Sequence, residues 1–290
     1  MGFYTEDGED GIGVTGMLRV GIVQMASGSD KGENLRRAEA MMGEALEGGA
    51  ELVVLPELFS FLPPKIDLEA YRRNSEPLEG PTVGRLRGIA EKEGVAIVAG
   101  SIVEASGNGL YNTSCLILPN GGLHPYRKVH LFRYGGINEA LVFSEGKGGE
   151  VFPWDGLRLG MTICYDLRFP EIYRMEALGG ANAICNVAAF LEKTGRSHWI
   201  TLLRARAIEN QVFVLAADQA RRDWDGPRYY GNSCIIDPWG RIITRAGYGE
   251  GVIVGDVRLE RVEEIRERLP SLTARRPEAY GLAAEKKEGD

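Results

Sequence analysis

The sequence is poor in the residue types that most often bind transition metals. Its 290 residues include three histidines and four cysteines, and no two cysteines have Cys-x-x-Cys spacing. A structural zinc site needs four such ligands at close, regular spacing, so we expect no metal site. We expect the cysteines to be reduced, and most of them buried, because they are widely separated. They are Cys115, Cys164, Cys185 and Cys234.

Long apolar runs and basic clusters are absent as well. The longest apolar runs, such as residues 95–100, have strand length and fall short of the ~20 residues that cross a bilayer. The formal net charge is -7, and an acidic protein is a poor partner for nucleic acid or an anionic membrane. Because the Gly-rich, acidic start does not resemble a signal peptide, we expect a cytoplasmic protein that binds neither nucleic acid nor membranes.

One apparent cofactor motif is rejected on its context. Residues 11–16 fit the pattern G-x-G-x-x-G. In a dinucleotide-binding loop this pattern follows a strand and begins a helix, whereas here it follows an acidic coil and precedes a strand. We therefore expect no organic cofactor. We interpret residues 1–17 as a disordered extension, residues 18–282 as one domain and residues 283–290 as a polar tail.

From residue 18 onward, apolar strands alternate with amphipathic helices. Such alternation is typical of an α/β protein in which helices cover the sheets. Hairpin-like pairs among these units make a purely parallel sheet a poor fit. The elements that matter most below are expected strands at 18–25, 51–56, 95–103 and 160–165 and expected helices at 31–47, 82–93 and 169–178.

The most informative segment places a cysteine between a strand and a helix. An apolar strand ends at Cys164, and Pro170 and Glu171 lie in the first turn of the helix that follows. Backbone N–H groups and the helix dipole at such a turn stabilise a thiolate and an oxyanion. Serine hydrolases use the same geometry at their nucleophile. The alternative is a buried structural thiol, the commonest role of a free cysteine.

Two charged side chains lie next to other apolar segments. Glu57 follows a buried strand, where partial desolvation would raise its pKa and let it carry protons near neutral pH. Lys128 lies among strand-like residues and could stabilise a thiolate and an oxyanion. A loop glutamate that caps the next element and a solvated basic patch are the alternatives. His130 and His198 offer a Cys–His pair instead.

The order of these segments resembles the nitrilase, or carbon–nitrogen hydrolase, superfamily over most of the chain. The resemblance implies a catalytic triad of Glu57, Lys128 and Cys164. It also implies a second glutamate, Glu139, although Glu145 lies close in sequence. The segments that carry the resemblance are residues 55–57, 126–132, 164–171, 204–211 and 237–240.

The same resemblance implies a fold, an assembly and a pocket. The fold is a four-layer αββα sandwich, and members form homodimers or larger assemblies. Within the superfamily, the motif at residues 164–171 is most similar to the omega-amidase and deaminated-glutathione amidase branch, in which an arginine binds the substrate carboxylate. A structural salt bridge with Asp166 or Glu171 is the alternative for that arginine. The pocket residues implied are Arg168, Tyr165, Phe190 and Thr194.

The resulting prediction is a cysteine-dependent hydrolase of small amides. It would cleave a non-peptide C–N bond of a carboxylate-bearing amide through a thioester and release ammonia, without a cofactor or metal. A nitrilase or an N-carbamoyl hydrolase would use the same triad. A non-catalytic scaffold relative and a thiol redox protein are further alternatives. The complete triad disfavours the former, and the lack of a nearby resolving cysteine disfavours the latter.

Overall fold

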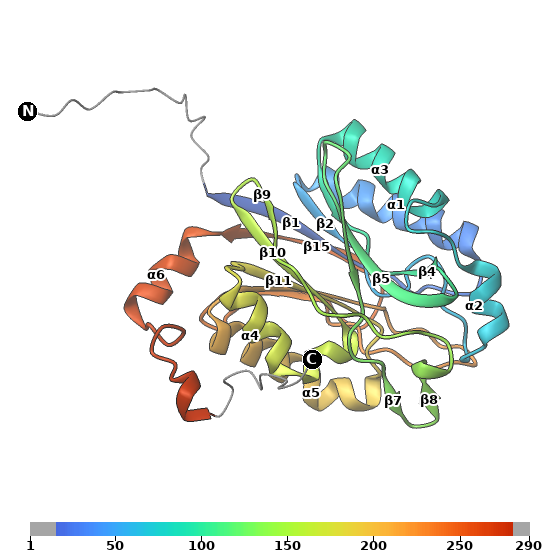
Figure 1. The fold of residues 1–290 in the computed structure, drawn as a ribbon. Coiled ribbons are helices and arrows are strands. Elements are labelled where there is room, and N and C mark those ends of the chain that lie inside the picture. The colour runs from blue at the N-terminus through green and yellow to red at the C-terminus, as the bar shows by residue number, and fades with distance from the viewer. Residues whose placement is uncertain (1–15, 281–290) are drawn as a thin grey trace, which may run out of the picture.

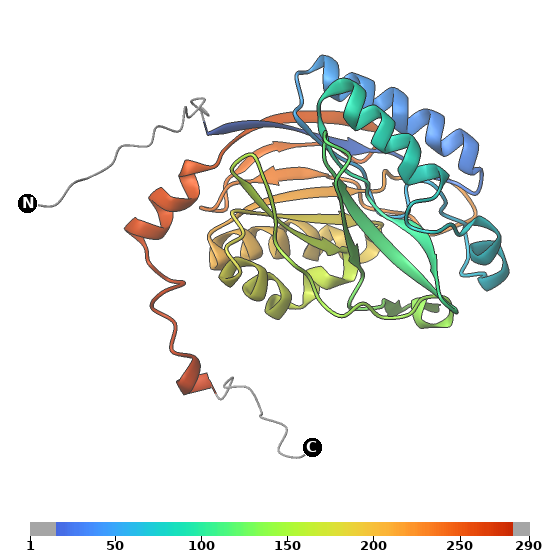
Figure 2. The same cartoon turned by 45° about the horizontal axis from the view of Figure 1, so that its top comes forward.

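The computed structural model describes residues 16–280, so most of the expected N-terminal extension and the whole polar tail lie outside the described residues. Two β-sheets pack face to face, and helices cover the outer face of each (Figures 1 and 2). This confirms the expected α/β sandwich of four layers. No helix among the described residues has the length and hydrophobicity needed to cross a membrane.

The first sheet has seven strands, six of them in the order β15-β1-β2-β3-β5-β4, and β6 pairs with β5. The pairs β1–β2 and β2–β3 are parallel and the others are antiparallel. Helices α1 and α3 cover its outer face. The bounds are β1 (Met17–Gln24), β2 (Leu52–Val54), β3 (Ala96–Val98), β4 (Ile102–Ser106), β5 (Gly109–Ile117), β6 (Leu123–Arg127), β15 (Gly251–Arg258), α1 (Lys31–Glu47), α2 (Leu68–Asn74) and α3 (Pro81–Glu93).

The second sheet has six strands in the order β14-β13-β12-β11-β10-β9, with β10, β11 and β12 parallel. Helices α4 and α5 cover its outer face, and α6 follows β15. The bounds are β9 (Phe152–Trp154), β10 (Leu157–Ile163), β11 (Ala183–Ala188), β12 (Phe213–Asp218), β13 (Cys234–Ile236), β14 (Ile242–Arg245), α4 (Pro170–Leu178), α5 (Glu192–Asn210) and α6 (Glu260–Arg268).

The continuous apolar runs of the first sheet follow from burial on both faces. Side chains alternate between the faces of a strand. In β2, Leu52 and Val54 join the core between the sheets, whereas Val53 joins the core beneath α1 and α3. Every position must therefore be apolar, and the strand reads as an unbroken hydrophobic run.

The expected strand at 95–103 is instead two strands, β3 and β4, separated at Gly100. This residue has a φ of 44°, in the left-handed region, and a Cβ there would collide with the carbonyl oxygen of Pro56. Glycine alone combines that conformation with so close a backbone approach. The break therefore lets the chain pass tightly against the residue that precedes Glu57.

Candidate active site

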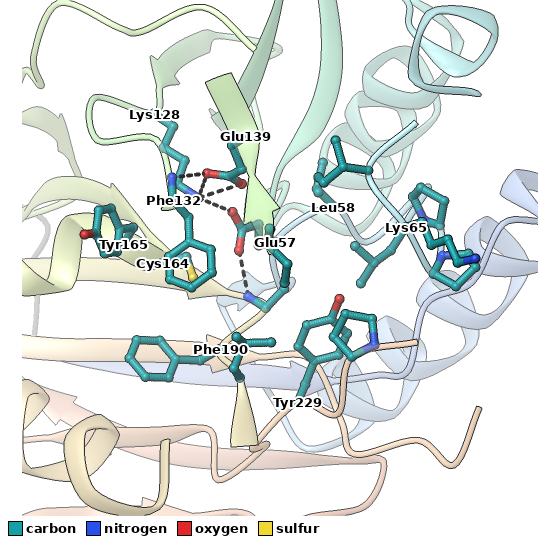
Figure 3. A pocket seen from close by; sticks show the side chains of 18 of the residues that line it. Glu57, Leu58, Lys65, Lys128, Phe132, Glu139, Cys164, Tyr165, Phe190 and Tyr229 are labelled. Atoms are coloured by element: carbon teal, nitrogen blue, oxygen red, sulfur yellow. Dashed lines mark hydrogen bonds and ion pairs between the residues drawn. The ribbon is translucent and has the colours of Figure 1, made fainter. Parts of the chain in front are cut away.

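Three buried charges form the centre of the site (Figure 3). The Lys128 ammonium donates to Glu57 Oε1 at 2.8 Å, and its Nζ lies 3.0 and 2.8 Å from the two carboxylate oxygens of Glu139. The exposed fractions are 1% for Lys128, 2% for Glu57 and 7% for Glu139. An isolated charge would be costly at this depth, so mutual pairing is the condition for burying all three.

Lys128 and Glu139 reach this point by local backbone pairing. Lys128 directly follows β6, and its N–H donates to the carbonyl of Asn112 in β5. Glu139 begins the 3₁₀ turn η1 (Glu139–Leu141) and pairs with Phe132 twice, through the backbone and through its own carboxylate. Glu145, the other candidate for the second glutamate, is exposed. Glu139 is therefore the glutamate that the fold brings to Lys128.

Glu57 is held by two further donors that the sequence did not indicate. Asn112 Nδ2 donates to Oε1 at 2.8 Å, and the Ala189 N–H donates to Oε2 at 2.7 Å. With Lys128, three of about four acceptor positions on the carboxylate are filled. One position on Oε2 stays open. Asn112 is followed in β5 by Thr113 and Ser114, so no local pattern distinguished it.

Cys164 occupies a strained position immediately after β10. Its φ is 47°, a left-handed conformation that is uncommon for a residue other than glycine. Residues Cys164–Arg168 form the short 3₁₀ turn η2, and α4 begins at Pro170. The expected strand at 160–165 thus ends at Ile163. Strain of this kind costs about 1–3 kcal/mol and persists only where the surroundings enforce it.

Asp166 holds the turn in place and was not singled out from the sequence. Its carboxylate accepts from the Ile163 N–H at 2.9 Å, from the Tyr126 hydroxyl at 2.7 Å and from the His130 N–H at 2.9 Å. His130 Nδ1 also lies 2.7 Å from it, and the His130 ring stacks on Phe169. The expected alternative of a Cys–His pair with His130 is therefore not formed. His130 instead stabilises the turn η2 through its contacts with Asp166 and Phe169.

The charges set the protonation states of the site. Burial raises the pKa of Cys164 well above its usual value, and the charge of Glu57 adds to this effect while Lys128 opposes it. Burial alone would lower the pKa of Lys128, but Glu139 and Glu57 outweigh it and raise that pKa. The resting site consequently holds a neutral thiol beside a permanent ammonium.

The eight side chains singled out from the sequence all line one cavity. It encloses about 710 Å³ of space between the protein atoms, including its open mouth. Its walls are otherwise mostly apolar, as is usual for small-molecule sites. Among residues 16–280, no group of three potential ligands is placed to hold a metal ion. The eight residues are Glu57, Lys128, Glu139, Cys164, Tyr165, Arg168, Phe190 and Thr194.

Arg168 lies against aromatic side chains rather than a carboxylate. Its guanidinium carbon is 5.1 Å from the centre of the Phe190 ring and 5.9 Å from that of Tyr165. Its Nη1 lies 3.1 Å from His198 Nδ1. Within the described part of the chain it has no salt bridge, so the alternative of pairing with Asp166 or Glu171 is not realised. Its charge is available to a ligand.

Sequence reasoning missed three polar residues that line the same cavity, namely Lys65, Tyr71 and Tyr229. Lys65 belongs to the irregular segment between β2 and α2. Tyr71 lies in α2, and Tyr229 lies in the long connection between β12 and β13. No periodic pattern marks the irregular segments, and Tyr71 reads as an ordinary core aromatic. Only the folded chain brings them to the cavity that contains Cys164.

Comparisons with known proteins agree with this geometry. The sequence profile of the family described as carbon-nitrogen hydrolase matches residues 19–267. Omega-amidase NIT2 of Mus musculus is 34% identical over 275 residues, which cover 93% of this chain and 99% of that protein. Deaminated glutathione amidase of Synechocystis sp. is 37% identical over 265 residues, covering 87% and 96% respectively.

A solved structure adds a chemical detail. The amidase of Nesterenkonia sp. AN1, from the nitrilase superfamily, has a TM-score of 0.75 and 27% identity, and the match covers 92% of this chain and 97% of that one. In that structure, the acetamide moiety of fluoroacetamide is covalently attached to the active-site cysteine. The sequence comparisons and the fold comparison therefore lead to the same family.

Proposed function

Because this chain belongs to the carbon–nitrogen hydrolase family and is a hydrolase that acts on amides, we propose that it works through a thioester on Cys164. One observation carries the proposal. The strained Cys164 shares a cavity with a buried Glu57–Lys128–Glu139 cluster in which Glu57 Oε2 accepts only one hydrogen bond from the described residues. The covalent adduct in a mutant of the Nesterenkonia amidase, in which the acetamide moiety of fluoroacetamide is attached to the cysteine, supports a nucleophilic role for the cysteine of such a site.

The first step is attack on the amide carbonyl. The open position on Glu57 Oε2 accepts the thiol proton as the Cys164 sulfur bonds to the carbonyl carbon. Lys128 compensates the negative charge that moves from the carboxylate to the substrate oxygen. The Tyr165 N–H, at the start of the turn, is the second donor to that oxygen. Because the thiol is neutral at rest, proton transfer must accompany attack.

The second step breaks the C–N bond and the third releases the acid. Glu57 returns its proton to the leaving nitrogen, so that ammonia or an amine departs and the thioester remains. Glu57 then activates a water molecule, which attacks the thioester and regenerates the thiol. Glu139 keeps Lys128 charged throughout, because at least one carboxylate faces the ammonium at each stage.

Arg168 defines the substrate class in this proposal. A guanidinium that has no salt bridge among residues 16–280 and lies near the Phe190 and Tyr165 rings at the cavity wall suits a substrate carboxylate. Phe190 supplies the surface on which Arg168 lies, and Thr194 lines the same wall. The preferred substrates are therefore small amides that carry a carboxylate on their acyl part.

We also propose that the protein acts as a homodimer in the cytoplasm. Four large apolar side chains in α4, in α5 and between β13 and β14 are about half exposed. They are Met175, Leu178, Ile208 and Trp239. Such residues favour a protein interface. All four cysteines are free, as expected for a reducing compartment. Light scattering on wild type and Ile208→Glu tests the dimer, and the substitution should give monomers.

Trapping the intermediate tests the mechanism. Acid quenching during turnover should leave the wild-type protein heavier by the mass of the acyl group, and Cys164→Ala should abolish both adduct and product. Glu57→Gln should also abolish turnover. Ammonia release from amides, nitriles and carbamoyl amino acids separates an amidase from a nitrilase or an N-carbamoyl hydrolase. Turnover near the wild-type rate in a folded Cys164→Ala protein would refute the thioester.

A further inference from the structure

Two adjacent polar residues at the end of strand β12 contact the surroundings of Glu57 from the second sheet. Asp218 is the last residue of β12 and Gln219 follows it, and both side chains are fully buried. Neither residue lines the active-site cavity, so neither touches a bound substrate. Buried polar groups need hydrogen-bond partners, and the partners of these two side chains lead to Glu57.

Gln219 connects the two sheets at the backbone of Glu57. Its Nε2 donates to the Glu57 carbonyl oxygen at 2.8 Å and to the Ser27 hydroxyl at 2.9 Å. Its Oε1 accepts from the Ser27 N–H at 2.9 Å, and its own N–H donates to the Ala188 carbonyl at the end of β11. Ser27 and Glu57 belong to the connections after β1 and β2, in the first sheet. One side chain therefore fixes the backbone of Glu57 to the second sheet.

Asp218 acts on the carboxylate of Glu57 through the segment between β11 and α5. Its Oδ1 accepts from the Phe190 N–H at 2.7 Å. The preceding N–H, that of Ala189, donates to Glu57 Oε2, the oxygen that takes the thiol proton in the proposed mechanism. Consecutive N–H groups of one segment thus donate to two carboxylates. Because Asp218 fixes the segment at Phe190, it also fixes the direction of the Ala189 N–H.

The contact between Asp218 and Phe190 does not require a charge. Burial raises the pKa of Asp218 well above its usual value, and Glu57 adds to the effect, whereas backbone N–H groups such as that of Phe190 oppose it. The second oxygen, Oδ2, has no hydrogen-bond partner among the described residues. A full charge on that oxygen would be costly. A neutral acceptor of the same shape, such as an amide, should therefore hold Phe190 as well as Asp218 does.

We infer that Asp218 and Gln219 are positioning residues for the proton carrier Glu57. Gln219 fixes the backbone of Glu57, and Asp218 fixes the segment that donates to its carboxylate. The inference rests on the proposed function, in which Glu57 meets the thiol of Cys164, the leaving nitrogen and the water molecule in turn. A carboxylate held at both ends keeps the orientation that these transfers need. Because neither residue touches the substrate, their loss should lower kcat and leave KM nearly unchanged.

Substitution of Asp218 tests this assignment on butyramide, a neutral primary amide that does not use Arg168. Asp218→Ala should lower kcat by about 10- to 100-fold with KM within about 2-fold. The Ala189 N–H should then no longer be held on Glu57, and a carboxylate that loses a donor binds its proton more tightly. The acidic limb of the pH profile of kcat/KM should therefore move up by roughly half a pH unit or more.

The conservative variant and a second site make the test specific. Asp218→Asn keeps the acceptor and should restore both kcat and the acidic limb. Gln219→Met keeps the length of the side chain but removes its donors, so it should lower kcat without moving the limb, because the Ala189 N–H stays in place. The other titratable side chains around Glu57 are unchanged in every variant, namely Tyr71, Lys128, Glu139, Cys164 and Tyr229.

Asn182→Ala is the matched control for lost stability. Asn182 is also buried, and its side chain accepts from the Arg158 N–H and donates to the Gly156 carbonyl, both at 2.8 Å. These contacts lie at the start of β11, whereas Ala188 is at its end. The control should therefore lower Tm and leave kcat and the acidic limb as in wild type.

Three outcomes would overturn the inference and leave the mechanism intact. They are an unchanged kcat and acidic limb in Asp218→Ala, a loss that Asp218→Asn does not restore, and a loss that Asn182→Ala shares. If Asp218→Ala does not fold, Gln219→Met with a wild-type kcat is the refuting result. Failure of the proposed function would look different, because amide hydrolysis would then survive Cys164→Ala.

Discussion

Buried carboxylates lie at two places near strand β10, and only at one of them does a cation pair with the carboxylates. Glu57 and Glu139 face the Lys128 ammonium beside Cys164. Glu176, in α4, is 1% exposed and packs against β10, where its Oε1 accepts from the Met161 N–H at 3.1 Å. Its other oxygen has no hydrogen-bond partner in the described part of the chain. Glu176 is buried about as deeply as Glu57 and Glu139, but no ammonium or guanidinium group among the described residues pairs with it.

The difference shows that burial alone does not decide charge. Burial raises the pKa of Glu176 well above its usual value, no cation opposes the effect, and Asp166 adds to it. Glu176 is therefore a neutral acid near pH 7. In the active-site cluster, burial raises the pKa of Glu139 as well, but there the Lys128 ammonium opposes the effect. The proposed mechanism requires this opposing cation, since a protonated Glu57 could not accept a thiol proton.

Removing the compensating cation should have the largest effect. Lys128→Met leaves two carboxylates facing each other without a counter-ion, which should destabilise the protein by about 3–5 kcal/mol and abolish hydrolysis. Denaturant unfolding and amide turnover measure the two effects. Adding Glu139→Gln should recover part of the stability but none of the activity. An unchanged unfolding midpoint in Lys128→Met would show that the cluster is not charged as described.

Arg168 extends the comparison to a cation whose proposed counter-ion is the substrate. Arg168→Met should lower kcat/KM for carboxylate-bearing amides by roughly 30- to 1,000-fold and spare neutral amides. Arg168→Lys should restore only part of the loss, because an ammonium cannot make a planar two-point contact. Kinetics on one charged and one neutral amide check this. Equal losses on both, together with a lower Tm, would indicate a structural role instead.

Burial of Glu176 makes the stability of the protein depend on pH, and the direction of the pKa shift gives the sign. Its pKa is higher in the folded than in the unfolded state, so the folded state keeps a proton that the unfolded chain has lost. Its contribution is fully present below the unfolded pKa and is lost as pH rises towards the folded pKa, with a slope of up to ~1.4 kcal/mol per pH unit.

Glu176→Gln should remove that slope, so the variant should gain on wild type as the pH of the unfolding experiment rises from about 5 to 8. Glu171→Gln is the matched control, because Glu171 lies exposed in the same helix. If the stability difference between Glu176→Gln and wild type does not vary with pH, the buried group is not a neutral acid.

The smallest effect on stability is expected where the buried group carries no charge. Cys185 is 1% exposed in β11, and burial keeps its thiol protonated by raising its pKa. Cys185→Ala should lower the free energy of unfolding by about 1–2 kcal/mol, at all pH values alike, and should preserve turnover. Complete loss of activity in a folded variant would mean that a second thiol takes part in the chemistry.

The sequence indicated that Glu57 and Cys164 follow buried strands, and the structure shows them after β2 and β10. Their assignment with Lys128 as a triad came from the resemblance of the three motifs to the carbon–nitrogen hydrolase superfamily. Apolar runs that alternate with amphipathic helices predicted an α/β protein with covered sheets, and the resemblance implied the four layers. Both kinds of signal are local, because each depends on residues within a few turns or strands of one another.

The parts that were missed depend on contacts between distant segments. Asn112 reaches Glu57 from 55 residues away, and Tyr229 enters from an irregular connection. Glu176 resembles a solvent-facing helix residue in sequence, since nothing local reveals that β10 covers it. The strand expected at 95–103 was wrong at Gly100 because its cause, the approach of Pro56, lies elsewhere in the chain. Secondary-structure propensity depends on neighbouring residues and therefore does not reveal contacts between distant segments.

The left-handed backbone of Cys164 has a consequence for how the sequence can change over time. At a φ of 47°, glycine would relieve the strain that cysteine bears. On the proposed mechanism, the residue that relieves the strain is an inactive one, so selection for folding alone does not favour cysteine here. On the same mechanism, a paralogue released from selection for catalysis should be recognisable by a glycine at this one position.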